Sequence, residues 1–69
     1  MKNVIYVKLL NEGTEVYRPI EAINIGQKSY QIIQETPQHE EWEFSFGDKV
    51  YCKTMELQNR KCLIATKKI

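Results

Sequence analysis

The sequence predicts a mostly β fold, a small five-stranded antiparallel barrel that spans residues 1–69 as a single domain. Three observations predict it. Short runs rich in β-branched and aromatic residues recur along the chain, turn sequences containing Gly, Pro or Asn separate them, and no stretch longer than about ten residues keeps a helical period. Since a chain of this length buries only about 60 % of its unfolded surface, its core must be compact.

The first strand is predicted at Val4–Leu10, which is dense in β-branched and aromatic residues. Ile5, Val7 and Leu9 share one face of this strand, and that face carries no charge. We therefore expect these three side chains to point inward. A turn follows at once, in which Gly13 can adopt positive φ.

The second strand, Val16–Ile25, is predicted to be irregular. Pro19 lacks an N–H donor and belongs at an edge, a bulge or a strand start. The apolar positions change parity between Ala22 and Ile23, which favours a bulge or a sharp bend there. A helix over residues 21–25 is the competing interpretation, which the β-branched residues disfavour.

Period-two alternation and turn signals predict the remaining strands at Ser29–Gln34, Lys49–Met55 and Lys61–Thr66. Turns are expected at residues 26–28 and 58–60. The last three residues are expected to fray.

The stretch Glu40–Cys52 holds the only Trp, both Phe residues and a Gly-Asp turn signal. If the chain is extended there, the rings of Trp42, Phe44 and Phe46 lie on one face. We expect Trp42 and Phe44 to fill or cap the core, because large rings must be buried in so small a domain.

Composition is ordinary for a soluble globular protein, with 42 % hydrophobic and 28 % charged residues. No apolar run approaches the roughly 18 residues that a membrane span needs. The N-terminal apolar run lacks a small-residue cleavage site, so a secretory signal is not expected. These features predict a cytoplasmic protein with no membrane partner.

Charge is unevenly distributed along the chain, although the net value is only +1. Residues 35–48 contain five acidic side chains and no basic one, whereas residues 49–69 contain six basic and one acidic. The low net charge argues against a large electrostatic binding surface for nucleic acid or for a membrane. The separation permits self-association that salt would weaken.

Two cysteines, Cys52 and Cys62, have neither CxxC nor zinc-ligand spacing. The default interpretation is a pair of reduced, partly buried thiols in a cytosolic protein. A hairpin loop of three or five residues would place them opposite each other and a two-residue turn would not; the turn sequence leaves both open.

A longer pattern connects these elements. The first block is the strand–turn–strand of residues 7–22 (VKLLNEGTEVYRPIEA), and the second is Tyr30-Gln31-Ile32. The third block begins with a Trp-x-Phe motif and continues with Gly-Asp-x-Val-x-Cys, which ends at Cys52. In this order the blocks resemble a family of small uncharacterised bacterial proteins, and the resemblance covers nearly the whole chain. It implies a Src-homology-3-like barrel and no activity, because the family has no assigned function. Tyr17 and Phe46 stand where Trp and Pro are expected to be common.

A candidate binding surface is predicted from the tyrosines on the strand faces opposite the residues that are expected to point into the core. Tyr6, Tyr17 and Tyr51 are its aromatic members, and Arg18 and Lys53 are its charged members. In barrels of this class, exposed aromatic side chains often form ligand grooves.

Neither a catalytic centre, a cofactor nor a metal site is expected. His39 beside Glu40 and Glu41 lacks the spacing of any zinc site, and a solvated loop is the simpler interpretation. The chain offers one His, no Gly-rich phosphate loop and no organised carboxylate pair, so we expect no enzyme.

The sequence favours a non-catalytic protein-interaction module whose partner is another protein or a second copy of itself. The alternative is an RNA- or DNA-binding module of the translation type. A basic C-terminal run could meet a phosphate backbone, although the same charges would keep an edge strand soluble. This run comprises Lys53, Arg60, Lys61, Lys67 and Lys68.

Overall fold

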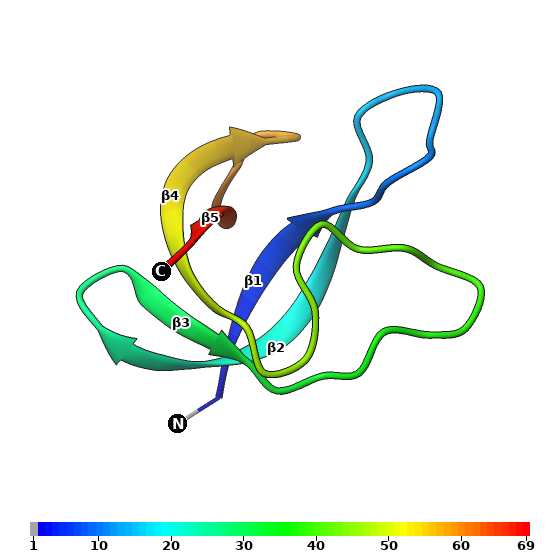
Figure 1. Cartoon of the computed structure of the whole chain (residues 1–69). Helices are drawn as coiled ribbons and strands as arrows, with labels where there is room; N and C mark the ends of the chain where they lie inside the picture. The colour runs from blue at the N-terminus through cyan, green and yellow to red at the C-terminus, as the bar shows by residue number, and fades with distance from the viewer. Residues whose placement is uncertain (1) are drawn as a thin grey trace.

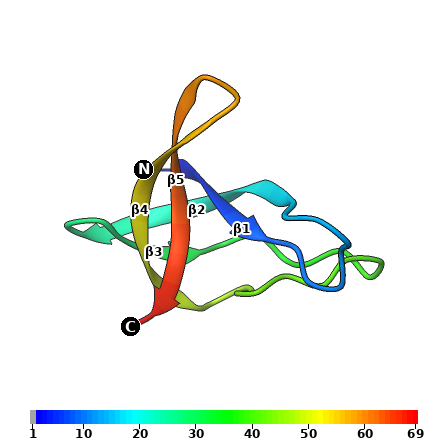
Figure 2. The same cartoon turned by 90° about the horizontal axis from the view of Figure 1, so that it is seen from above.

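The computed structural model describes residues 2–69, which form five β-strands and no helix. The strands close into a barrel in the order β1-β2-β3-β4-β5, as Figures 1 and 2 show. Among the described residues there is accordingly no helix long and apolar enough to cross a membrane. The strands are β1 (Lys2–Lys8), β2 (Tyr17–Gly26), β3 (Ser29–Ile32), β4 (Lys49–Leu57) and β5 (Arg60–Lys68).

The core lies inside the barrel and is assembled by alternation along the strands. Ile5 and Val7 of β1 are fully buried, and Leu9 beyond its end is 7 % exposed, so the predicted inward face is confirmed. Val50 and Cys52 supply the corresponding face of β4. The buried side chains that form one cluster are Ile5, Val7, Leu9, Ile20, Ala22, Tyr30, Ile32, Trp42, Phe44, Val50, Cys52 and Ala65.

Closure of the barrel corrects one part of the predicted topology. Four of the strand pairs are antiparallel, but β1 meets β5 in parallel, at Tyr6 opposite Ile64. The sheet is therefore mixed rather than purely antiparallel. An odd number of strands that run alternately up and down must close with two strands of the same direction side by side.

The second strand is irregular, as predicted, but the irregularity lies elsewhere. Regular pairing with β1 continues as far as Lys2 opposite Ile23, and the register of β2 against β3 shifts only between Asn24 and Gly26. Ile23 and Ile25 are 36 % and 44 % exposed. The parity change at Ala22–Ile23 thus reflects two apolar side chains on the outer face and not a bulge at that point. The helix alternative for residues 21–25 is wrong.

The segment from Ile33 to Asp48 is a long connection held to the barrel at a few points. Trp42 and Phe44 are buried, which confirms their predicted role, and Trp42 forms an isolated bridge with Leu9. Phe46 is 58 % exposed, so the three rings do not share one face. The chain turns at Gly47 (φ 88°), whose N–H donates to the Ile32 carbonyl, and this turn rotates Phe46 away from the core.

The tight turns follow the turn chemistry of the sequence with two exceptions, one of which is the turn at residues 26–28, where Lys28 and not Gly26 has positive φ (56°). Gln58 and Asn59 both have positive φ between the paired residues Leu57 and Arg60, as a two-residue type I′ hairpin requires. In the β1–β2 connection the positive φ (63°) falls on Asn11, not on Gly13. The C-terminus is also better ordered than predicted, because β5 extends to Lys68 and the N–H of Ile69 donates to the Lys49 carbonyl.

Candidate binding groove

A groove of about 410 Å³ lies on the outside of the barrel, between the tip of the β4–β5 hairpin and the start of β2. Figure 2 shows this hairpin projecting beyond the other strands. The groove brings together residues from β1, β2 and both arms of the hairpin, which are far apart in the sequence. Its lining consists of Tyr6, Glu15, Val16, Tyr17, Leu57, Gln58, Arg60 and Cys62.

Two of the predicted surface tyrosines share this groove. Tyr6 points outward because its neighbours Ile5 and Val7 fill the core, and Tyr17 lies opposite Lys8 on the adjoining strand. Both tyrosines are half-buried. A ring held in this way offers contact area without a large loss of conformational entropy on binding.

The part of β5 next to the groove is apolar on both faces. Leu63 and Ala65 face the core, whereas Cys62 and Ile64 alternate with them and are buried outside the main cluster, at 9 % and 3 % exposure. Ile64 lies between Tyr6 of β1 and Lys53 of β4 in one row across three strands. The outer face of the sheet therefore carries a small apolar layer of its own.

Lys53 and Tyr51 lie on this outer face but not in the groove. Lys53 stands at the end of the Tyr6–Ile64–Lys53 row and is exposed. Tyr51, 40 % exposed, pairs with Lys67, whose Nζ lies 5.3 Å from the centre of the tyrosine ring. The Tyr51 ring thus has a cation–π partner from its own chain.

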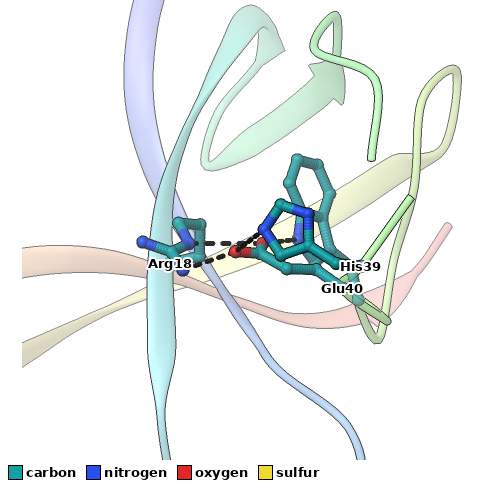
Figure 3. A network of polar contacts seen from close by, with 4 residues as sticks. Arg18, His39 and Glu40 are labelled. Atoms are coloured by element: carbon teal, nitrogen blue, oxygen red, sulfur yellow. Dashed lines mark hydrogen bonds and ion pairs between the residues drawn. The ribbon is translucent and has the colours of Figure 1, made fainter. Parts of the chain in front are cut away.

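Arg18, the fifth predicted surface residue, belongs to a different face. It follows Tyr17 on β2 and so points to the opposite side of the strand, towards the connection that carries Glu40. Its guanidinium donates to the Glu40 carboxylate through Nε (3.3 Å) and through a second nitrogen. Figure 3 shows this pair bridging β2 and the long connection.

Glu40 is the centre of that polar contact. Its side chain is 11 % exposed, and its Oε1 accepts the indole N–H of Trp42 at 2.8 Å. The Trp42 and Arg18 hydrogen bonds lower the pKa of Glu40 below its ordinary value of 4.5. His39 Nε2 lies 3.8 Å from the same carboxylate and is largely exposed. The network holds the segment from Ile33 to Asp48 over one end of the barrel. Because it lies beside the buried Trp42 ring, we assign it a structural role.

Several acidic side chains of residues 35–48 have partners within the chain. Glu40 binds Arg18, Asp48 lies 3.6 Å from Lys68 Nζ, and Glu41 accepts a hydrogen bond from Asn11. Asp48 also accepts the backbone N–H of Ser45, which fixes the Gly47 turn. The charge separation along the sequence is consequently smaller in space than in the sequence.

The two cysteines are free, buried and on opposite faces. Cys52 faces the core opposite Ala65, and Cys62 lines the groove opposite Met55. The two-residue turn at the hairpin tip sets this register, which settles the alternative that the sequence left open. Burial raises the pKa of the Cys52 thiol to about 11, which makes it a poor nucleophile.

Within residues 2–69, no three His, Cys, Asp or Glu side chains are grouped so that they could hold a metal ion. At the groove, Cys62 Sγ contacts the Arg60 carbonyl at 3.8 Å, and no His is among the lining residues. What the lining offers a ligand is contact surface: two phenol rings, aliphatic side chains, one carboxylate and one guanidinium.

Comparison with known proteins gave no match: no protein-family model, no curated protein and no solved structure is similar to this chain at a significant level.

Sequence reasoning missed most of the groove lining. Val16 and Cys62 are predicted as strand residues and Arg60 as part of a turn and of the basic run. Leu57 falls in no predicted strand or turn. One signal could have pointed to it, the unbroken apolar run from Cys62 to Ala65, because a strand that is apolar on both faces must be covered on both.

Proposed function

We propose that the protein is a non-catalytic binding module that holds a segment of another protein in the groove at Tyr6 and Tyr17. The observation that carries the proposal is the convergence of these two half-buried rings on one groove that Val16, Leu57 and Cys62 also line. Aromatic anchors within an apolar centre and a polar rim are typical of protein-recognition sites.

Two finer expectations are part of the proposal. The barrel is of the Src-homology-3-like kind and belongs to the bacterial family that the sequence resembles. A cytoplasmic location fits the two unpaired cysteines, because a reducing compartment keeps thiols free. The small size and closed strand order support the first expectation.

The experiment is a selection of displayed random linear peptides on the immobilised protein, followed by ¹H–¹⁵N NMR titration with an enriched peptide. Binding should shift the amide signals of Tyr6, Tyr17 and Cys62. Tyr17→Ser should abolish enrichment, because it removes a groove ring. Tyr51→Ser is the matched control, since it removes an exposed tyrosine outside the groove and should leave binding intact.

Enriched peptides that bind the Tyr17→Ser variant as well as the native protein, or that shift signals on another face, would refute the proposal. Both variants should retain the native near-ultraviolet circular dichroism of the buried Trp42, which verifies that they fold.

The second candidate, RNA or DNA binding, is favoured by one observation, the basic side chains on the outer face of β4 and β5. Lys53 and Arg60 are exposed there, and Lys67 stands over Tyr51. Filter binding of single- and double-stranded oligonucleotides at low and moderate salt tests it. No retention at low salt would eliminate this candidate, because phosphate contacts are strongest there.

A further inference from the structure

The outer faces of β1, β4 and β5 carry charge of one sign, whereas the outward Glu21 of β2 is acidic and lies 3.8 Å from Lys2 Nζ. Alternation places the side chains that flank each inward residue on the outside. On β1, β4 and β5 all the charged side chains at these outward positions are basic within residues 2–69. They are Lys2, Lys8, Lys49, Lys53, Arg60 and Lys67.

Three of these basic residues border the groove from three strands. Arg60 lines it directly. Lys8 pairs with Tyr17 across β1 and β2, and Lys53 ends the row that starts at Tyr6. The single acidic lining residue is Glu15. The rim therefore carries three basic side chains and one acidic side chain.

Two acids of the chain are engaged away from this rim. Glu40 and Asp48, from the acidic segment, are paired with Arg18 and Lys68 at other places on the barrel. A ligand that brings negative charge beside an apolar side chain would thus meet three basic side chains and one acidic side chain, Glu15, at the groove.

Resting on the proposed function, we propose that the groove takes an acidic, extended segment of a different protein that carries one apolar or aromatic anchor residue. The anchor enters between Tyr6 and Tyr17 above Cys62, and acidic residues on either side of it meet Lys8, Lys53 and Arg60. Opposite charges on a rim raise the rate of association and select the partner more than they add affinity.

The observations favour an acidic protein segment over a nucleic acid. Besides the two tyrosines, the groove lining includes Val16, Leu57 and Cys62, which suit an aliphatic or aromatic side chain better than a phosphate. Glu15 on the rim would repel a phosphate backbone, whereas a peptide can place a neutral residue beside it. The Tyr51 ring, on which a base could stack, already has Lys67 Nζ over it, 5.3 Å from the ring centre.

The experiment measures the acidic content of the selected peptides and the affinity of two variants of the β4–β5 hairpin for one of them. Peptides enriched on the native protein, compared with the unselected library, should carry an excess of Asp and Glu next to an apolar residue. For one such peptide, Arg60→Glu should weaken binding about fivefold or more, since an exposed ion pair contributes up to about 1 kcal/mol and reversal turns attraction into repulsion.

Lys61→Glu is the matched control. It introduces the same charge change one residue along the same hairpin, but on the opposite strand face, opposite Glu56. It should leave peptide binding within about twofold of the native value, which is within the usual effect of a distant surface charge. Raising the salt concentration should weaken the native interaction, and it should weaken the residual binding of Arg60→Glu less, because that variant keeps only Lys8 and Lys53 as attractive charges and adds a repulsive one.

Each other outcome overturns the inference in a distinguishable way. Enriched peptides that need Tyr17 but show no acidic excess overturn it and leave the proposed function intact. Failure to enrich any Tyr17-dependent peptide overturns both. Displacement of the peptide by single-stranded RNA at an equal concentration assigns the groove to nucleic acid. Sedimentation of the protein alone as an oligomer that Arg60→Glu dissociates assigns it to a second copy of this chain.

Discussion

Replacing two isoleucines of β2 by threonine tests the inward and outward assignment of the whole strand. Ile20 is 1 % exposed and Ile23 is 36 % exposed, although both are β-branched residues of the same strand. Threonine keeps the β-branched shape, so strand propensity changes little at either position. The difference between the two variants therefore reports burial.

The expected magnitudes follow from that burial. Ile20→Thr removes about two methylene equivalents of buried surface, at about 0.8 kcal/mol each. It also buries a hydroxyl in an apolar cluster without a partner, which costs about a further 1–3 kcal/mol. We expect the free energy of unfolding to fall by about 3–4 kcal/mol. At Ile23 water solvates the hydroxyl, and we expect a loss below about 1 kcal/mol.

The assay is urea unfolding followed by the fluorescence of Trp42, the only tryptophan and a buried one. Stabilities of about 0.05–0.15 kcal/mol per residue make Ile20→Thr a severe change for a domain of this size. If that variant does not fold, Ile20→Val against Ile23→Val supplies the same contrast, with an expected loss of about 0.5–1.5 kcal/mol at Ile20 only. Equal losses at the two positions would show that β2 turns its other face inward near Ala22, and the assigned register would be wrong.

Two further predictions concern pH. Because hydrogen bonds from Trp42 and Arg18 lower the pKa of Glu40, the stability that its ionised form contributes is present above pH 4.5 and is lost as the pH falls through the lowered folded-state value. Acid titration of the native protein should therefore show a loss of stability below pH 4.5 that is smaller in Glu40→Gln; an identical acid profile in both would contradict the role of that carboxylate. Burial raises the pKa of Cys52 to about 11 from an ordinary 9.0, so the unfolded chain ionises first and stability should decline as the pH rises from about 9 to about 11. Cys52→Ala should flatten that decline, and mass spectrometry after iodoacetamide treatment at pH 8 should find Cys52 unmodified in the folded protein; rapid alkylation there would mean that the thiol is not buried.

Much of the fold could be predicted from local pattern. Alternation at Ile5, Val7 and Leu9 identified the inward face of β1, and the turn residues 58–60 marked the tip of the last hairpin. These features depend only on neighbours in the sequence: side chains alternate along any strand, and a tight turn needs residues that tolerate positive φ.

Other features could not be predicted in that way. Phe46 continues the aromatic alternation of its segment, yet the turn at Gly47 leaves it exposed. Ile23 and Ile25 are apolar and lie outside the core, since a small barrel has too little interior for all its apolar side chains. Pattern alone does not show which apolar positions remain outside.

The candidate site was likewise predictable from the sequence only in part. Tyr6 and Tyr17 were predicted to point outward, and their meeting in one groove depends on the pairing of β1 with β2 and on the bend of the β4–β5 hairpin. Arg18 was assigned to the same surface, but it is next to Tyr17 in the strand and so faces the other way, towards Glu40.

The sequence by itself determined that this chain forms a β domain, which residues of β1 and β4 fill its core, and that its last hairpin is basic. Periodicity and turn chemistry are local properties, so they can be predicted from neighbouring residues in the sequence. The tertiary structure decided that β1 closes the barrel in parallel against β5, that Glu40 is bound by Arg18 and Trp42, and that a groove opens beside Cys62. These are contacts between segments distant in sequence, and they depend on register and strand curvature, which no single segment specifies.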